Sequence, residues 1–333
     1  MLNTKNKIKM VQINGTVRNE LTNKKQSTNE SGMVIGLSSC SLIVDKLSKI
    51  LIDKGFEFYS ICAEYDRLLK ELPTENEPVL LSSVDMQAFN SATFLLIKEK
   101  INTVVGEVVY LMIDLSSDTS ISLVIELAKI SKIQGKIVVA IIAIPANRHD
   151  VECLREAKNA LAILRPFVDT SFVFYKDTLN EDTADKNVFP TLNDDIAFSM
   201  PLDAIYRIAY QQGEIVVDES DVKYLLKSGA FAAVGIGQSN LPNRISIMFE
   251  QVLDSRYLKF LNKEKCTLIL LSIEASVQNA IRFDEIEELD NLLHQHFGEE
   301  VDIIMGLKND NALGDTAKVV CLFSFSEHEL ITI

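Results

Sequence analysis

Few residues in this sequence of 333 have the type and spacing of a chemical site. His149 and Cys153 stand four apart and could share a helix face, but two ligands are too few for a zinc site. The five cysteines are an odd number without a C-x-x-C pair, which argues against a disulfide framework and favours the reducing cytoplasm. The sequence therefore predicts no metal site, and the remaining candidates lie in polar loops.

Two serine-rich runs come between a predicted strand and a predicted helix. They are Gly-Leu-Ser-Ser-Cys-Ser at 36–41 and Ser-Ser-Asp-Thr-Ser-Ile-Ser at 116–122. Glycine suits a phosphate-binding loop because it adopts positive φ and leaves N–H groups open to oxygen. The whole sequence has only 13 glycines, about 4% where ~7% is typical. Serine and aspartate instead cap helices, so Ser38 or Ser39 could cap the first helix and Asp118 or Ser120 the second.

A third polar pattern is Asp218-x-x-Asp221, which precedes an amphipathic stretch. An acidic residue at the N-cap and another three residues later resemble a capping box, in which each side chain accepts a backbone N–H of the first turn. Taken alone, the spacing predicts the start of a helix.

The elements that must position these loops alternate between strand and helix. Apolar, β-branched runs of this kind are typical of strands buried on both faces of a doubly wound parallel sheet. We expect strands at 33–37, 56–62, 108–113, 136–144 and 170–175, and helices at 121–134 and 151–163. A mostly apolar helix follows at 194–212, where Pro201 should kink the helix or delay its start.

A second α/β unit completes the chain. Periodicity predicts helices at 219–227, 244–255 and 283–297, and strands at 230–236, 266–273, 301–307 and 316–325. Two α/β units joined by one long helix form an uncommon architecture.

In order and spacing, these motifs resemble the FtsZ/tubulin family. Residues 213–222, Gly-Glu-Ile-Val-Val-Asp-Glu-Ser-Asp-Val, resemble the family's G-L-x-N-x-D-F-A-D-V, and Gly235-Ile-Gly resembles its M-G-x-G. The resemblance covers residues 32–326. It continues in four further stretches, at 243–244, 268–273, 283–285 and 301–306. In the first half, residues 145–169 have the spacing that the family shows between its T-K/R-P and V-D elements.

The resemblance implies an α/β fold with a Rossmann-like parallel-sheet N-terminal domain, a long central helix and a smaller α/β C-terminal domain. The implied boundaries are 32–193 for the degenerate GTPase-like domain, 194–213 for the helix and 214–328 for the C-terminal domain. Residues 1–31, with six basic and two acidic side chains, are expected to be a flexible basic extension. With a tail of only 329–333, we expect no long linker or adaptor peptide after the last strand.

The family's nucleotide site is where this sequence departs from the pattern. Family members bind GTP with loops resembling G-x-G-G-A-G-G and G-G-G-T-G-T-G, and Lys176 replaces the asparagine of their P-N-D segment. A carboxylate about 4 Å from a phosphate charge costs about 4 kcal/mol at an effective dielectric of 20, which makes Asp118 unfavourable for GTP. The implied, degenerate site consists of these residues: Gly36, Ser38, Ser116, Ser117, Asp118, Thr119, Ser120 and Asp195.

Asp218 and Asp221 match family acids that enter the next subunit's nucleotide site and orient the attacking water. The accompanying asparagine is Val216 here, so the loop is incomplete. Two hypotheses remain open, namely that the two acids only cap a helix, or that they keep a catalytic or docking role in trans.

Two functions follow from the resemblance. In the first, the chain is a pseudo-GTPase without nucleotide, whose GTPase activity is lost, and it caps or modulates filaments of authentic FtsZ or of itself by head-to-tail docking. In the second, it is a divergent self-assembling GTPase that binds GTP or GDP. The formal charge of −14 excludes a general nucleic-acid surface. The longest apolar runs have about ten residues, where about 20 are needed to span a bilayer, so we expect no membrane insertion.

Overall fold

The computed structural model describes residues 32–37, 40, 43–44, 47–48, 54, 56–62, 79–80, 92–103, 106–115, 121–145, 151–176, 194–211, 213–259 and 261–326. The chain divides into two compact units, which are described separately. The first contains residues 1–168 and 176–191, and the second contains 169–175 and 192–333. Within the described part of the chain, no helix is long and apolar enough to cross a membrane.

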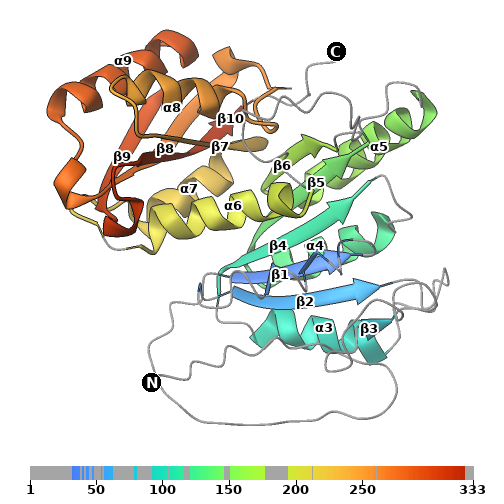
Figure 1. The fold of residues 1–333 in the computed structure, drawn as a ribbon. Coiled ribbons are helices and arrows are strands. Elements are labelled where there is room, and N and C mark those ends of the chain that lie inside the picture. Colours follow the sequence, from blue (N-terminus) through green and yellow to red (C-terminus); the bar gives the residue numbers. More distant parts are fainter. Residues whose placement is uncertain are drawn as a thin grey trace, which may run out of the picture. The chain divides into compact units, whose positions relative to one another are not determined.

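Strands of the first unit are all parallel to their neighbours and follow in the order β3-β2-β1-β4-β5 (Figure 1). They are β1 (Gly32–Leu37), β2 (Phe56–Cys62), β3 (Val79–Leu80), β4 (Val108–Asp114) and β5 (Ile137–Ile144). The helices of this unit are α3 (Ala92–Thr103), α4 (Ile121–Ile133) and α5 (Val151–Leu164), followed by a 3₁₀ turn at Arg165–Phe167.

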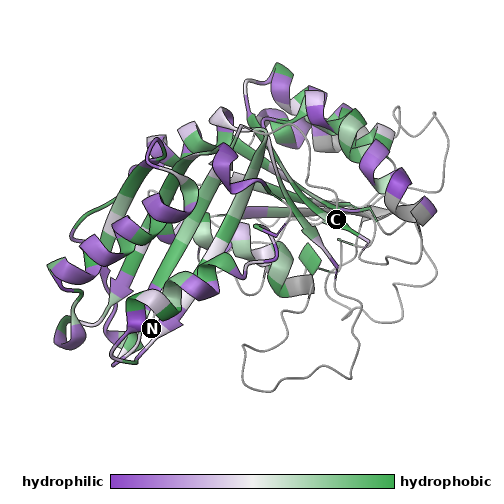
Figure 2. Cartoon of the chain, turned by 90° about the horizontal axis from the view of Figure 1, so that it is seen from above, coloured by the Kyte–Doolittle hydropathy of each residue, from purple (hydrophilic) through white to green (hydrophobic). Residues whose placement is uncertain are grey.

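The core of the first unit explains why its strands are apolar throughout. Every residue of β1, β4 and β5 is buried, as expected for parallel strands covered on both faces. Figure 2 shows the same contrast, with hydrophobic strands and helices that carry hydrophilic residues along one side. The predicted strand–helix alternation is therefore confirmed, and the sequence reading missed α3 and the two-residue β3.

The second unit has a mixed sheet in the order β6-β7-β10-β8-β9. Its last strand, β10, is antiparallel to both β7 and β8, whereas the β6–β7 and β8–β9 pairs are parallel. The strands are β6 (Thr170–Tyr175), β7 (Phe231–Ser239), β8 (Cys266–Ala275), β9 (Asp302–Asn309) and β10 (Ala317–Phe325). The helices are α6 (Asp194–Ala209), α7 (Glu219–Ser228), α8 (Arg244–Leu253) and α9 (Phe283–Phe297).

Helix α6 accommodates Pro201 without ending. A proline cannot donate a hydrogen bond to the carbonyl four residues earlier, which here belongs to Ala197. That carbonyl instead accepts a 2.6 Å hydrogen bond from the buried Tyr257 hydroxyl. Burial holds the pKa of Tyr257 well above its ordinary value, so the phenol keeps the proton that it donates. The helix begins at Asp194 as predicted, and Pro201 does not delay it.

Candidate functional site

One candidate region is the edge of the first sheet where the parallel strands end. In open α/β sheets, ligands bind at the carboxyl ends of the strands. Here Gly36 is the penultimate residue of β1, and Asp114 is the last residue of β4. Lys176 reaches the same edge, because its backbone N–H donates to the carbonyl of Ile144, the last residue of β5, at 2.9 Å.

An ion pair occupies this edge. The Lys176 Nζ atom lies 2.8 Å from Oδ2 of Asp114. The Asp114 side chain is 5% exposed and that of Lys176 is 28% exposed, so the acid lies inside and the ammonium group reaches the surface. A buried carboxylate is costly unless a cation and hydrogen bonds compensate it, and Lys176 supplies that compensation. The sequence reading did not include Asp114, although an acid that ends a buried apolar strand is a recognisable signal.

Gly36 has a packing role that is independent of any phosphate. A Cβ atom at this position would collide with the Val44 side chain and come within 2.8 Å of the Cys40 carbonyl oxygen. Both residues are helical and buried. The close approach of this helix to β1 therefore requires glycine at position 36.

The other predicted nucleotide contacts have no described side chains. Ser38, Ser116, Ser117, Asp118, Thr119 and Ser120 lie outside the described residues, and Asp195 is placed in α6 without a described side chain. Asp195 also belongs to the second unit. These residues stay predictions.

The second candidate region is the segment from Gly213 to Asp221 in the second unit. Its backbone is tied to β9, since the N–H groups of Glu214 and Ile215 donate to the Leu307 carbonyl at 2.9 and 3.1 Å. The Leu307 N–H donates back to Ile215 at 2.8 Å. Gly213 permits this contact, because a Cβ there would lie 2.6 Å from the Leu307 carbonyl oxygen.

Asp218 and Asp221 form the start of α7. Asp218 is the N-cap residue, and its backbone N–H donates to Oδ2 of Asp221 at 3.1 Å, which is the reciprocal arm of a capping box. Asp218 is exposed and Asp221 is half-buried. The geometry gives Asp221 a structural task and leaves Asp218 on the surface.

Large apolar side chains stand exposed at the same end of this sheet. The C-terminal ends of β7, β8 and β9 meet there, since Ser239 pairs with Ala317 at the start of β10 and Ala275 pairs with Asn309. We call this set the loop-end surface, and it consists of Ile215, Val216, Leu241, Val277 and Phe283, which are 48–80% exposed. All five residues lie in or next to the loops at this end of the sheet, and an exposed apolar surface is a candidate interaction site.

Next to Gly213 lies a group of charged side chains that are buried or half-buried. Arg207 contacts Asp203 at 2.9 Å and Glu274 at 2.8 Å, and Glu274 is 1% exposed. Lys308, 3% exposed, donates to the Ile208 carbonyl at 3.3 Å. Burial lowers the pKa of Lys308 from 10.5 to about 8, against the opposing attraction of Glu274.

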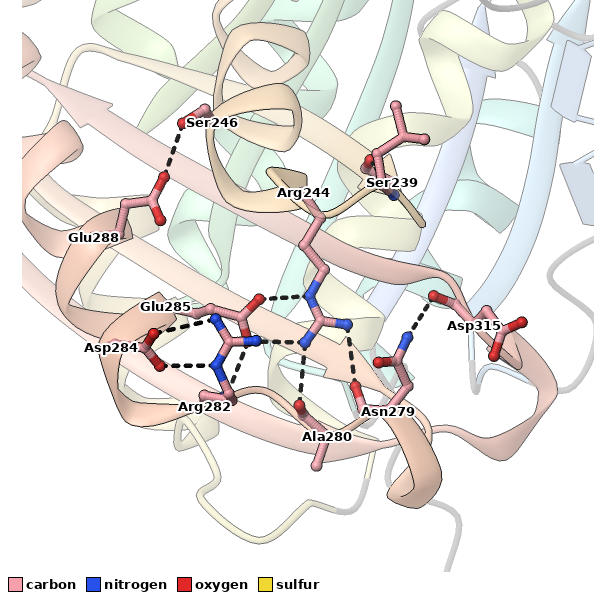
Figure 3. Close-up of polar contacts among 11 residues, drawn as sticks. Ser239, Arg244, Ser246, Asn279, Ala280, Arg282, Asp284, Glu285, Glu288 and Asp315 are labelled. Atoms are coloured by element: carbon pink, nitrogen blue, oxygen red, sulfur yellow. Dashed lines mark hydrogen bonds and ion pairs between the residues drawn. The ribbon is translucent and has the colours of Figure 1, made fainter.

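A second buried ion pair fixes the base of the loop-end surface (Figure 3). Arg244 opens α8 and binds both oxygens of Glu285 in α9, at 2.7 and 2.8 Å. Arg244 also donates to the Asn279 and Ala280 carbonyls, each at 3.1 Å. Its hydrogen bonds hold the pKa of Glu285 below the ordinary value. Two motifs that are 41 residues apart in the sequence, at 243–244 and 283–285, are therefore joined by one structural contact.

Metal chemistry has no support in the described side chains. Among them, no group of three or more histidine, cysteine, aspartate or glutamate residues could hold an ion. His149 lies outside the described residues, so the predicted absence of a His149–Cys153 site stays a prediction.

No family model matches the sequence. The cell division protein FtsZ 1 of Thermococcus kodakarensis is 24% identical over 223 residues, which is 65% of this chain and 57% of the relative. An empty FtsZ dimer from M. jannaschii shares the fold with a TM-score of 0.68 and 19% identity, covering 92% of this chain and 96% of that one.

A third likeness is to TubZ of Bacillus thuringiensis serovar israelensis in a GTPγS-form protofilament. Its TM-score is 0.67 at 13% identity, over 92% of this chain and 90% of that chain. The match to the FtsZ 1 relative spans little more than half of that protein's length. The order of motifs, the two-unit fold and the curated relatives agree, and the chain is similar to FtsZ proteins in both sequence and fold.

Proposed function

We propose that the chain is an FtsZ-like pseudo-GTPase that docks onto FtsZ-type filaments and limits their growth. The observation that carries this proposal is the Asp114–Lys176 ion pair at the edge of the first sheet, where the family resemblance places a nucleotide. The proposal has two parts, namely the loss of nucleotide binding in the first unit and a docking surface that is kept in the second unit.

The ion pair argues against GTP because the Lys176 ammonium is already committed. Turning it toward a phosphate would leave the Asp114 carboxylate buried without its cation. Breaking a buried pair in this way costs on the order of 3–5 kcal/mol, which is roughly a hundredfold to several thousandfold in affinity. The one glycine retained in the first loop, Gly36, has a packing role that needs no ligand.

Docking is supported by the second unit. Head-to-tail filaments use two different faces of each subunit, so a subunit can lose one face and keep the other. Asp218 and the loop-end surface remain exposed, with apolar side chains such as Val216 beside the acid. The solved relatives include an FtsZ dimer and a TubZ protofilament. A subunit that attaches through this face and accepts no further subunit would cap a filament.

Co-sedimentation with an FtsZ-type protein and GTP tests this proposal. We expect the chain to pellet with filaments and to shorten them, and we expect Val216→Asp to abolish both effects. Ile133→Asp is the matched control, because Ile133 is 79% exposed in α4 of the first unit. Failure of the unmodified chain to pellet or to change filament length contradicts the proposal.

The alternative function is a divergent GTPase that assembles by itself. Two observations favour it, namely the likeness to TubZ in a GTPγS form and the partial exposure of Lys176, which gives its ammonium group access to solvent. In that case GTP hydrolysis should rise more steeply than protein concentration, because Asp218 would act on the neighbouring subunit's nucleotide, and Asp218→Asn should lower it.

A further inference from the structure

The edge of the second unit's sheet carries backbone groups without partners. Strand β9 stands last in the strand order and, among the described strands, pairs only with β8 (Figure 1). The N–H and the carbonyl of Leu307 both bond to Ile215, so they point away from β8. Because successive residues of a strand point their peptide groups to opposite sides, those of Ile303 and Met305 also point outward. Within the described residues, no hydrogen bond reaches these outward groups.

This part of the edge is built as a strand-binding site. A strand that adds to a sheet edge needs a regular row of free backbone groups, with side chains beside them that its own side chains can cover. The β8–β9 register runs without a bulge from Asp302 to Asn309, and β9 contains no proline. Ile303, Ile304 and Met305 are half-buried, so they offer apolar surface on both faces of the strand. Natural proteins usually block such an edge with proline, a bulge or a covering segment.

The length of the open edge limits what can bind there. The 213–215 segment occupies the outward side at Leu307, where it runs antiparallel to β9. At the other end, the Val301 N–H donates to the Gly298 carbonyl at 3.4 Å. An added strand therefore has room between these two points. If it runs antiparallel, it continues the line of the 213–215 segment and exchanges two hydrogen bonds with each residue whose groups point outward.

Charge decides which kind of strand fits this edge. Glu299, Glu300 and Asp302 are exposed at the N-terminal end of β9. No lysine or arginine stands between Arg282 and Lys308, so this stretch of sequence supplies no cation to compensate them. Opposite charges on neighbouring strands attract, whereas like charges opposite each other repel. An incoming strand should therefore carry basic residues at the end that passes these acids.

We propose that β9 binds an extended segment of a partner protein as an added antiparallel strand. The segment is apolar opposite Ile303 and Met305, and it is basic at its C-terminal end, which passes Asp302 and Glu300. The backbone of β9 supplies the affinity, and the alternate side chains of the segment supply the selectivity. The proposal uses neither the nucleotide region nor the side chains of the loop-end surface, so it stands apart from the proposed function.

Peptide binding to the full-length chain tests the proposal. The probe is acetyl-Ser-Val-Thr-Val-Lys-Thr-Lys-amide, which can place its valines opposite Met305 and Ile303 and its lysines opposite Asp302 and Glu300. We expect saturable binding in a calorimetric titration. At saturation, amide hydrogen exchange at Ile303 and Met305 should slow about fivefold or more, because each N–H gains a hydrogen bond. Exchange at Ile304, whose N–H points toward β8, should not change.

Two control peptides separate the contribution of the backbone from that of charge. Replacing the central Thr-Val by Pro-Pro removes a donor from each edge of the peptide, and we expect it to abolish binding. Replacing both lysines by glutamates keeps the backbone donors and should weaken binding about tenfold. Equal binding of the proline peptide, or of the glutamate peptide, would overturn the proposal.

Matched changes in the chain locate the site. Glu300→Lys/Asp302→Lys should weaken binding of the lysine peptide about tenfold and strengthen binding of the glutamate peptide. Glu250→Lys/Asp315→Lys changes the net charge by the same amount at exposed positions in α8 and in the turn before β10. We expect this control to keep both affinities within about twofold. Equal weakening by the two double variants would show a general charge effect and contradict the proposed site.

Exchange in the absence of peptide shows whether the edge is open. We expect the N–H groups of Ile303 and Met305 to exchange much faster than that of Ile304 in the free chain. Exchange as slow as at Ile304 would mean that the edge is already covered, which overturns the proposal. Protection that rises with protein concentration also overturns it, because the occupant would then be a second copy of this chain. So does failure of the lysine peptide to bind saturably.

Discussion

The acidic residue at the edge of the first sheet and the one at the loop end of the second sheet differ in their exposure and in their partners. Asp114 is buried and paired with Lys176 at 2.8 Å, so its negative charge is compensated within the protein. Asp218 is exposed beside apolar side chains, and its charge is available to a partner. The contrast shows that two acids at the loop ends of strands can differ in exposure and in partner, and the proposed function depends on that difference.

The largest expected effect comes from breaking the buried pair. Lys176→Met leaves the Asp114 carboxylate buried without its cation, and we expect it to lower the free energy of unfolding by about 3 kcal/mol. Chemical denaturation measures the change. Removing both charges in Asp114→Asn/Lys176→Met should recover most of the loss.

Arg155→Met is the matched control for that prediction. Arg155 forms a 3.1 Å ion pair with Glu152, but both side chains are more than 60% exposed. An exposed pair of this kind contributes less than about 1 kcal/mol. If Lys176→Met and Arg155→Met lowered the free energy of unfolding equally, the Asp114–Lys176 pair would contribute no more than an exposed ion pair.

A smaller effect is expected from Gly213→Ala in the second region. The new Cβ would lie 2.6 Å from the Leu307 carbonyl oxygen and 2.7 Å from Cγ of Lys308, so the segment must move off β9. Overpacking of this kind costs about 2 kcal/mol. Faster amide exchange at Ile215 and Leu307, with the first unit unchanged, would locate the damage; unaltered exchange would contradict this account of Gly213.

A pH-dependent effect on the free energy of unfolding is expected at Lys308. Its native pKa of about 8 lies below the unfolded value of 10.5, so between these pH values the unfolded chain binds the extra proton and stability rises with pH. Lys308→Met should therefore be more stable than the unmodified protein below pH 8, with the difference shrinking toward pH 10.5. Unfolding curves at several pH values measure this, and a difference independent of pH would refute it.

The smallest effect on stability is expected from Asp218→Asn. Asparagine caps helices as well as aspartate does, so the free energy of unfolding should change by less than about 0.5 kcal/mol. Co-sedimentation with FtsZ-type filaments should nevertheless weaken if the carboxylate takes part in docking. An unchanged pelleted fraction would assign Asp218 to capping alone.

Local patterns were enough to predict most of the framework. The predicted limits of 56–62, 170–175 and 283–297 coincide with β2, β6 and α9, because each has a clear periodicity and a polar or glycine boundary. Helix α3 and strand β3 were missed. The continuity of α6 through Pro201 depends on Tyr257, which lies 60 residues from Ala197 and leaves no local signal.

The candidate sites were harder to predict for the same reason. Asp114 and Lys176 are 62 residues apart, and Arg244 and Glu285 are 41 apart, so each pair exists only after the chain has folded. The nucleotide role of Gly36 stays a prediction, and its packing role was not visible in the sequence, because Val44 and Cys40 approach this position only in the folded chain. Sequence spacing finds capping pairs such as Asp218 and Asp221, because both partners lie within one turn.

Nucleotide content is the most direct test of the claim that the first region has closed. Protein purified without added nucleotide would be heat-denatured, and the released nucleotide would be quantified by chromatography, with GTP and GDP titrated into a parallel sample by calorimetry. The closed site predicts far less than one nucleotide per chain and no measurable heat of binding. Stoichiometric GDP or GTP in the extract, or saturable binding of either, would contradict it.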